Sequence, residues 1–454
     1  MLRYVILFFS LALLWASCGS ESAPKSADGW QTLFNGKNLK GWSRLNGDAE
    51  YIVEDGAIVG TTKRGSPNTF LATDQKFADF RLEFEVKIDT FINSGVQFRS
   101  NSTDYMNGKV HGYQAEIDAS SRAWSGGIYD ESRRGWLFPM GLNPAGGRAY
   151  NPLDWNKITV EAIGSEIKTW VNDVPAAFLI DDLTDRGFVA LQVHSIERAE
   201  LNGRKIRWKN IRILEDPKDR KAGTFSHIVN TLPNNLSEPE VALGWISLFD
   251  GTSSDRWRGA GLEKFPEIGW KVSDGELMVL ESGGAEAAHG GDIVTRDEFA
   301  SFDFQLEFKL TKGANSGIKY FVTEEYETEG SAIGLEYQIL DDSEHPDANE
   351  GVDGNRTLAS LYDLIPADKP DRYVRPPGEW NHARIVVKPN DMVEHWVNHI
   401  KVLEYRRGSA MFKNLVRNSK YKDYKNFGLA DQGHILLQDH GNQVSFRSIK
   451  VRNL

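Results

Sequence analysis

The second half of the chain repeats the first half. Short phrases recur in the same order at a spacing of about half the chain: LFNGKNLKGW (33–42) returns as LFDGTSSDRW (248–257), and NSGVQF (93–98) returns as NSGIKYF (315–321). The phrases GIYD and SLYD, then WN, then WVN follow in both copies. Solenoid repeats have periods of roughly 20–50 residues, so one long repeat predicts two whole domains, each large enough for its own core.

A polar segment between the two sets of recurring phrases separates the copies. We predict the first domain over 29–216 and the second over 244–454. The segment 217–243 is polar and contains proline, which predicts a linker.

The N-terminus has the pattern of an export signal. Arg3 precedes the apolar run VILFFSLALLWA, which is shorter than the ~20 residues needed to cross a bilayer but typical of a signal peptide. Small residues then precede Cys18, the only cysteine, in the order of a bacterial lipobox. We predict a lipoprotein signal over 1–18, lipidation of Cys18 and a flexible tether over 19–28, with an ordinary signal peptide as the alternative. The expected location is exported and membrane-anchored, in the periplasm or on the cell surface.

Within each copy, apolar and polar residues alternate with a period of two. The stretch FRLEFEVKI (80–88) is a clear example, and glycine-containing turns separate such stretches, whereas long amphipathic helix patterns are nearly absent. This pattern predicts an all-β fold, with an antiparallel β-sandwich or jelly roll in each copy.

Net charge and motifs narrow the function. The formal net charge is −11, which argues against nucleic acid as a partner because phosphate binding needs a basic face. The sequence shows no phosphate loop, dinucleotide fingerprint, zinc spacing or GxSxG nucleophile motif.

Glutamine and histidine recur together near the end of each copy. Successive strand side chains point to opposite faces, so LLQDH places Gln438 and His440 on one face and turns Asp439 away. The first copy keeps the same pair as Gln192 and His194.

A carboxylate and an amide recur on another strand. Glu336 and Gln338 share a face in GLEYQILDD, as do Gln114 and Glu116 in GYQAEID. An ungapped alignment sets Glu336 against Gln114 and Gln338 against Glu116. The two side chains have therefore exchanged places, while each copy keeps one of each.

Cations and aromatic residues complete the predicted face. Lys319 shares a face with Gly317 in NSGIKYF, and the face of the first copy carries Gln97 and Arg99. Tyr362 and Tyr129 stand in the recurring YD phrases. Amides, carboxylates and aromatic rings together are the groups that bind sugar hydroxyls and pyranose faces. A solvated sheet face is the alternative interpretation.

The phrases NSGIKYF, GLEYQILDD, LYDLIP, PPGEWN, VEHWVN and LLQDHGNQVSFRSIKV together resemble the 3-keto-disaccharide hydrolase family, also described as 3-keto-glucoside-1,2-lyase/3-keto-2-hydroxy-glucal hydratase. The likeness is close along most of 244–454 and divergent over roughly 29–215. It implies a concanavalin-A-like jelly roll in each half, a saccharide substrate and a role in bacterial saccharide breakdown.

The implied chemistry gives roles to the predicted face. Oxidation of a glucoside at C3 acidifies the C2 hydrogen, so one base, one proton donor and one group that stabilises the enolate oxygen are enough for elimination at C1. Glu336 or His440 would be the base, and His440, Tyr362 or a water would be the acid. The ketone or enolate would be held by Lys319, Gln338 and Gln438. The counterparts in the first copy would be Glu116, His194, Tyr129, Arg99, Gln114 and Gln192.

Two other functions stay open, and so does a metal. A non-catalytic carbohydrate-binding surface lipoprotein fits the same fold class. EID (116–118) resembles the strand motif of laminarinase-type glycosidases, but Ser120 and Ser121 stand where a second glutamate is needed. No cofactor is certain. The acidic stretch DDSEHPDANE (341–350) is a candidate for Ca²⁺ and, alternatively, an ordinary solvated loop.

Overall fold

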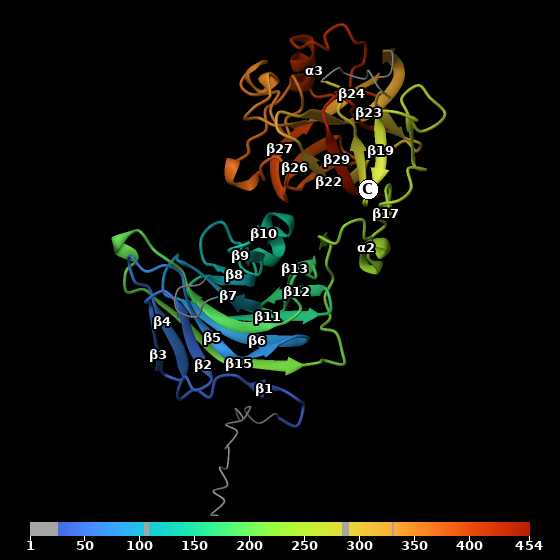
Figure 1. The fold of residues 1–454 in the computed structure, drawn as a ribbon. Helices are drawn as coiled ribbons and strands as arrows, with labels where there is room; N and C mark the ends of the chain where they lie inside the picture. Colours follow the sequence, from blue (N-terminus) through green and yellow to red (C-terminus); the bar gives the residue numbers. More distant parts are fainter. Residues whose placement is uncertain (1–25, 104–108, 284–289, 329–330) are drawn as a thin grey trace, which may run out of the picture.

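The computed structural model describes residues 26–103, 109–283, 290–328 and 331–454. The predicted signal, Cys18 and most of the predicted tether lie outside the described residues. The all-β prediction is confirmed: each copy is a sandwich of two sheets, and Figure 1 shows the two sandwiches as separate bodies along the chain.

The first sandwich consists of a nine-stranded and a seven-stranded sheet, counted over the described residues. The nine-stranded sheet has the order β16 (Val229–Asn230), β13 (Val174–Ile180), β12 (Glu166–Val171), β11 (Asn156–Ile163), β6 (Phe80–Ile88), β15 (Lys205–Glu215), β4 (Ala57–Thr61) and β3 (Glu50–Glu54), with β1 (Gln31–Thr32) paired to β15. The seven-stranded sheet has the order β10 (Gly135–Phe138), β9 (Ile128–Glu131), β8 (Val110–Asp118), β7 (Asn93–Ser102), β14 (Gly187–Val193), β5 (Thr69–Phe77) and β2 (Trp42–Asn46).

The second sandwich has an eight-stranded and a five-stranded sheet over the same described ranges. The eight-stranded sheet has the order β19 (Trp270–Ser273), β20 (Glu276–Val279), β29 (Val444–Asn453), β22 (Phe302–Leu310), β25 (Asn381–Val387), β26 (Met392–Val397) and β27 (Ile400–Arg406), with β17 (Ile246–Ser247) paired to β29. The five-stranded sheet has the order β18 (Trp257–Gly259), β21 (Ile293–Thr295), β28 (His434–Leu437), β23 (Asn315–Thr328) and β24 (Ser331–Leu340).

The period-two pattern places the core between the sheets. On β6, Phe80, Leu82 and Phe84 are buried in one cluster with residues of β7 and β8, and β22 contributes its alternate apolar residues to the core of the second domain in the same way. Burial of such side chains contributes roughly 25 cal/mol per Å² of apolar surface, so each sandwich is stabilised by its own core.

The helices are short. They are η1 (Met140–Leu142), α1 (Pro144–Gly147), η2 (Ala199–Leu201), α2 (Glu238–Ala242), η3 (Pro346–Asn349), η4 (Asp371–Tyr373) and α3 (Ala410–Arg417). None of the helices in the described ranges is long and apolar enough to cross a membrane.

The strand orders show that the duplication extends to topology. The order β2-β5-β14-β7-β8 in the first domain corresponds to β18-β21-β28-β23-β24 in the second. Beyond β8 the first domain adds β9 and β10, whereas the second has isolated bridges from Leu361 to Tyr337 and Ile365. The matching sheets therefore provide matching faces, which differ at one edge.

The linker packs against both domains. Its strand β16 pairs with β13 of the first domain. Glu240 of α2 forms a buried ion pair with Lys450 of the second domain (2.5 Å), and Asn234 accepts a hydrogen bond from the backbone N–H of Ser448 (2.8 Å). Figure 1 shows this segment running from one sandwich to the other.

Candidate active site

Polar side chains line up across the five-stranded sheet of the second domain. Where β23 pairs with β24, Gly317 stands opposite Gln338 and Lys319 stands opposite Glu336. The residue between them on β24, Tyr337, belongs to the core. Since directly opposed side chains share a face of the sheet, Lys319, Glu336 and Gln338 lie together on the face that points away from the core.

An ion pair anchors the lysine of this group. The Lys319 ammonium lies 3.3 Å from Asp292 Oδ2 and donates to the carbonyl of Ala332 (3.2 Å). Asp292 Oδ1 accepts a hydrogen bond from the backbone N–H of Asp439 (2.9 Å). These side chains are buried, so the pair fixes the lysine beside Glu336 and joins β21, β23 and the end of β28.

Glu336 is a buried carboxylate on which the charges of two lysines act. It is 6% exposed, and its burial raises its pKa above the ordinary value, while the charges of Lys319 and Lys420 act in the opposite direction. With its amide nitrogen turned toward the carboxylate, Gln338 donates to Glu336 Oε1 (3.2 Å) and to the carbonyl of Ser316 (3.1 Å). A carboxylate whose pKa is raised is better suited to act as a general base.

Tyr362 borders the group at the edge beyond β24. Its backbone N–H donates to the carbonyl of Glu336 (3.0 Å), and its hydroxyl donates to Asp347 Oδ2 (2.8 Å). Burial raises the pKa of Tyr362, and the Asp347 carboxylate raises it further. The Lys420 ammonium lies 4.1 Å from the centre of the Tyr362 ring. The phenol thus stays protonated, with its proton directed at Asp347.

Gln438 and His440 follow the end of β28, which stops at Leu437. The backbone N–H of Gln438 donates to the carbonyl of Gly317 (3.0 Å), so this segment still borders β23. His440 is half-buried, and its Nδ1 has no hydrogen-bond partner among the described residues. A positive charge on His440 would lower the pKa of Glu336, so the two side chains interact electrostatically.

The first domain has the corresponding face on its seven-stranded sheet. Gly95 stands opposite Glu116 and Gln97 stands opposite Gln114, in agreement with the ungapped alignment. Glu116 is 3% exposed and accepts hydrogen bonds from Gln114 Nε2 (3.1 Å), Arg122 Nη2 (3.2 Å) and the amide of Asn93. Burial raises the pKa of Glu116 to about 7.

Gln192 and Tyr129 lie on the same face. Gln192 pairs with Gly95 in the β14–β7 ladder and is fully buried, yet neither its amide nitrogen nor its oxygen has a hydrogen-bond partner among the described residues. Tyr129 stands opposite Gln114, and its ring centre lies 5.2 Å from that of Trp136. A buried amide without partners costs about 1–3 kcal/mol, which is recovered when a ligand or water binds it.

One residue predicted for the first-domain site is turned out of it, and a second lies past a strand end. Arg99 has a φ of +45° where the β7–β8 register shifts, and its guanidinium bonds the carbonyls of Ala78 and Gly164 (both 2.8 Å) and Asp79 (2.9 Å). A bulge turns a side chain out of the alternation, so Arg99 is structural. His194 lies past the end of β14, and the contact that involves its ring is with the carbonyl of Ser195 (2.7 Å).

The two faces differ in charge at matching positions. Leu191 pairs with Leu71, and Leu437 pairs with Ile293, so Phe70 occupies the place of Asp292. In the same comparison Gln97 replaces Lys319, and Val193 replaces Asp439. The three positions that form the ion-pair network in the second domain are therefore occupied by uncharged residues in the first domain.

A family model for the 3-keto-alpha-glucoside-1,2-lyase-like domain matches residues 29–214 and 244–452. The chain belongs to this family. Each matched segment contains both sheets of one sandwich, apart from β16, together with its polar face, so the family domain is present twice.

One curated relative agrees with the family match, and solved structures share part of the chain's length. The chain is 38% identical over 242 residues to a protein of Bacteroides thetaiotaomicron named 3-keto-disaccharide hydrolase, covering 49% of this chain and 82% of the relative. A solved structure from Parabacteroides distasonis, whose description names a glycosyl hydrolase, is 29% identical over 49% of this chain and 100% of that one, with a TM-score of 0.43. The carbohydrate binding module CBM66 from Bacillus subtilis is 17% identical, covers 38% of this chain and 96% of the module, and has a TM-score of 0.27.

Sequence reasoning missed Asp292, Lys420 and Arg122. Asp292 is brought in by β21, Lys420 by the segment after α3, and Arg122 by the loop between β8 and β9. The register of β21 and the course of these two loops bring them to the two carboxylates. A weak signal existed for Asp292 alone, because it directly precedes an apolar strand.

The acidic stretch 341–350 has its own partners. Asp341 accepts from the backbone of Gly313 (2.8 Å) and the Ser343 hydroxyl (2.7 Å), and Asp347 binds Arg356 (3.0 Å) as well as Tyr362. Across the described residues, no set of three or more His, Cys, Asp or Glu side chains is arranged to hold a metal ion.

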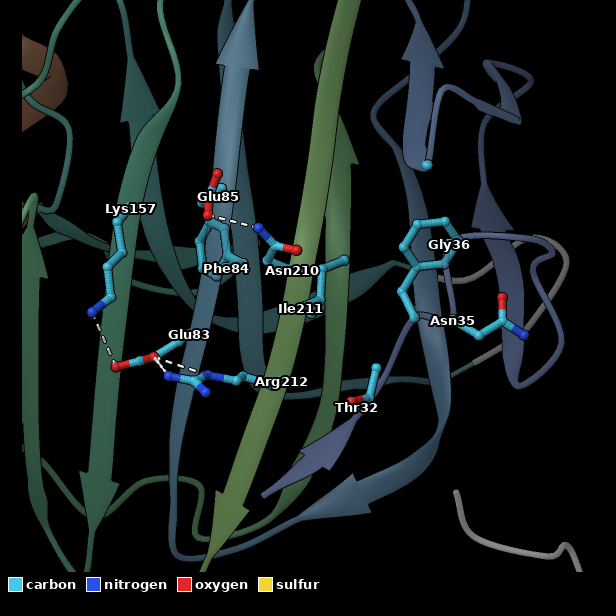
Figure 2. Close-up of a pocket in the computed structure, with 12 residues that line it drawn as sticks. Thr32, Asn35, Gly36, Glu83, Phe84, Glu85, Lys157, Asn210, Ile211 and Arg212 are labelled. Carbon is cyan, nitrogen blue, oxygen red and sulfur yellow. Dashed lines mark hydrogen bonds and ion pairs between the residues drawn. The ribbon is translucent and has the colours of Figure 1, made fainter. Parts of the chain in front are cut away.

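A cavity of about 520 Å³ lies on the outer face of the nine-stranded sheet (Figure 2). There Glu83 bonds Arg212 (2.6 Å) and lies 3.4 Å from the Lys157 ammonium, and Glu85 accepts from Asn210 (2.7 Å). These groups satisfy one another and lie on the other sheet from Glu116. The polar faces described above are therefore the better candidates for chemistry.

Proposed function

We propose that the second domain cleaves 3-keto-glucosides by elimination across C1 and C2, with Glu336 as the base. The observation that carries the proposal is the buried Glu336 carboxylate, which has a raised pKa, stands opposite Lys319 and is acted on by the charges of Lys319 and Lys420. The name of the Bacteroides relative and the family description support this substrate class.

The proposed steps balance without an added cofactor. The Glu336 carboxylate takes the C2 proton, and the C–H electrons form an enolate with the C3 oxygen. The enolate collapses back to the ketone, forms the C1–C2 double bond and expels the aglycone oxygen, which takes a proton. Water can then add at C1 and a proton at C2, so the net reaction is hydrolysis to 3-keto-glucose. The cations beside Glu336 favour the enolate because they stabilise negative charge as it develops.

We assign His440 as the donor to the leaving oxygen. Its Nδ1 has no protein partner among the described residues. The Tyr362 proton, in contrast, is directed at Asp347. Tyr362 is thus better suited to position the sugar than to protonate it, and Gln338 and Gln438 can hold the hydroxyls or the ketone.

For the first domain the observations favour saccharide binding as a second candidate function. It lacks the Lys–Asp pair, keeps the buried and unpartnered amide of Gln192, and places Trp136 against Tyr129. These are groups for recognition, whereas the cationic field that would stabilise an enolate is reduced to Arg122, which already pairs with Glu116 and Asp118.

The decisive experiment measures cleavage of a small panel of 3-keto-glucosides and their unoxidised parents by the full-length protein. Only the oxidised compounds should react, and Glu336→Gln should lower kcat by about 10²–10⁴, the range for loss of a general base. The exposed Glu404→Gln is the matched control and should retain wild-type turnover. Wild-type kcat in Glu336→Gln would refute the proposal, and turnover of unoxidised glucosides would favour a conventional glycoside hydrolase.

We further propose that the protein is exported and anchored to a membrane through lipidated Cys18. The lipobox order of the sequence supports this. Wild type expressed in a bacterial host should incorporate labelled fatty acid and sediment with membranes, and Cys18→Ser should do neither. Equal labelling of the two would contradict the anchor.

A further inference from the structure

A cavity of about 310 Å³ lies between the two domains. The first domain contributes the loop after β8 and strands β9 and β10, and the second contributes the segment around η4 together with Asn398. The cavity adjoins the first-domain face, because Arg122 lines it and also bonds Glu116. A cavity of this size is large enough for a sugar residue.

Four arginines line this cavity, and the described lining contains no aspartate or glutamate. Arg122 and Arg134 come from the first domain and already pair with carboxylates beneath them. Arg372 and Arg375 come from the second domain, and neither has a carboxylate oxygen within ion-pair distance among the described residues. Arg375 instead donates to the carbonyl of Trp380 (2.9 Å), and Arg372 to the hydroxyl of Tyr373 (3.1 Å).

Arginines of the two domains face each other across the cavity. Burial lowers the pKa of Arg375 most; the charge of Glu307 opposes this lowering, and the positive charge of Arg134 adds to it. A bound anion would offset the repulsion between these arginines. The chain as a whole carries a net charge of −11, so this positive cavity is a local exception and not a reflection of overall composition.

Aromatic rings form the remaining walls. Trp136 and Tyr129 contact each other edge to face, with ring centres 5.2 Å apart and planes at 68°. Tyr373 lines the opposite side and carries the Arg372 guanidinium 4.9 Å from its ring centre. Aromatic faces bind the apolar faces of pyranose rings, and paired guanidinium groups bind carboxylates through two parallel hydrogen bonds.

We propose that this inter-domain cavity binds a sugar residue that carries a carboxylate, with Trp136, Tyr129 and Tyr373 against the ring and Arg372 and Arg375 on the carboxylate. The site takes anionic saccharides and stands apart from the proposed cleavage at Glu336. A chain that carries such a residue would be held at the entrance to the Glu116 group.

The test compares three probes on the full-length protein by calorimetry: methyl glucuronide, methyl glucoside and acetate. The glucuronide should bind at least about tenfold more tightly than the other two, and its affinity should fall as salt is raised. Equal binding of the two glycosides, or acetate binding as strong as that of the glucuronide, would overturn the proposal.

Variants locate the site. Arg372→Gln with Arg375→Gln should remove the preference for the glucuronide. Arg372→Gln alone should weaken it, and because Arg372 is exposed this change leaves the fold intact. The exposed Arg406→Gln, which does not line the cavity, is the matched control and should bind as wild type does. An unchanged preference in Arg372→Gln and in the folded double variant would refute the assignment. Glu336→Gln should still bind the glucuronide, so failure of the cleavage proposal is distinguishable from failure of this one.

Discussion

The polar faces of the two domains use the same strand positions with different charges. In the second domain the carboxylate stands opposite a lysine, and in the first it stands two residues further along the strand, opposite a glycine. Each carboxylate keeps a glutamine from the same strand as a hydrogen-bond donor, at 3.2 Å from Glu336 and 3.1 Å from Glu116. The scaffold therefore tolerates a shift of the acid by about 7 Å while its partner is preserved.

The difference in charge separates the expected roles. Glu336 lies in a field of buried and surface cations that can stabilise an enolate. Glu116 is held by three hydrogen-bond donors beside an aromatic wall. The comparison teaches that the ion pair, and not the carboxylate alone, distinguishes the proposed catalytic face from the proposed binding face.

The largest effect is expected when the ion pair is broken. Asp292→Asn removes one charge of the buried Lys319–Asp292 pair, and breaking such a pair costs about 3–5 kcal/mol of the free energy of unfolding. Turnover of a 3-keto-glucoside should fall as well, because Lys319 loses its anchor. Denaturant unfolding and kcat measure the two effects. Phe70→Leu, at the matching position of the first domain, is the control: it breaks no ion pair, should cost less than the ~3–5 kcal/mol of a Phe→Ala truncation, and should leave kcat unchanged. Equal stability of Asp292→Asn and wild type would contradict the role of the pair.

Exchange of the carboxylate and the amide tests position directly. The double variant Glu336→Gln/Gln338→Glu gives the second domain the order found in the first, and it moves the acid away from Lys319. We expect kcat for a 3-keto-glucoside to fall at least about 100-fold. The reverse exchange, Gln114→Glu/Glu116→Gln, should change kcat less than about twofold. Full activity of the first double variant would show that position on the strand does not matter.

Much of this arrangement could be predicted from the sequence. Alternation assigned Glu336, Gln338 and Lys319 to one face because strands have a period of two, and the repeat supplied the alignment that the ladders reproduce. Alternation failed at Arg99 because the strand bulges there. It does not extend to His194, Gln438 and His440, which lie past strand ends.

The charged partners that come from other strands and loops could not be predicted. Asp292 and Arg122 reach the two carboxylates only through the register of β21 and the course of the loop after β8. Periodicity describes one strand at a time and contains no information about which distant segment lies beside it.

The pH dependence of stability should differ between the two carboxylates. Burial raises the pKa of Glu116 to about 7 from an ordinary value of 4.5, so its contribution is fully present below about pH 4.5 and is lost as the pH rises through 7. Relative to Glu116→Gln, wild type should therefore lose about 2 kcal/mol between pH 5 and pH 8. Denaturant unfolding at the two pH values measures this. Relative to Glu336→Gln, wild type should also lose stability between these pH values, but by less. The reason is that the charges of Lys319 and Lys420 oppose the rise in the pKa of Glu336. An equal or larger loss of stability measured against Glu336→Gln would contradict the effect of these two lysines on the Glu336 carboxylate.

The glycines beneath the two faces offer the finest comparison. A Cβ added at Gly317 would lie 2.4 Å from Glu336 Oε1, and one added at Gly95 would lie 2.2 Å from the Gln114 carboxamide carbon. Both contacts are too short, so Gly317→Ala and Gly95→Ala should each lower the free energy of unfolding by about 1–3 kcal/mol. Only Gly317→Ala displaces the proposed base, and it should lower kcat for a 3-keto-glucoside about tenfold.

Gly95→Ala is therefore the internal control for the steric change, because it strains the same position of the fold without touching Glu336. Denaturant unfolding reports the shared effect and turnover reports the difference. If both alanines lowered kcat equally, the two faces would act together in one reaction, and the division between a catalytic and a binding domain would be wrong. If neither lowered kcat, the carboxylate above Gly317 would not be the base.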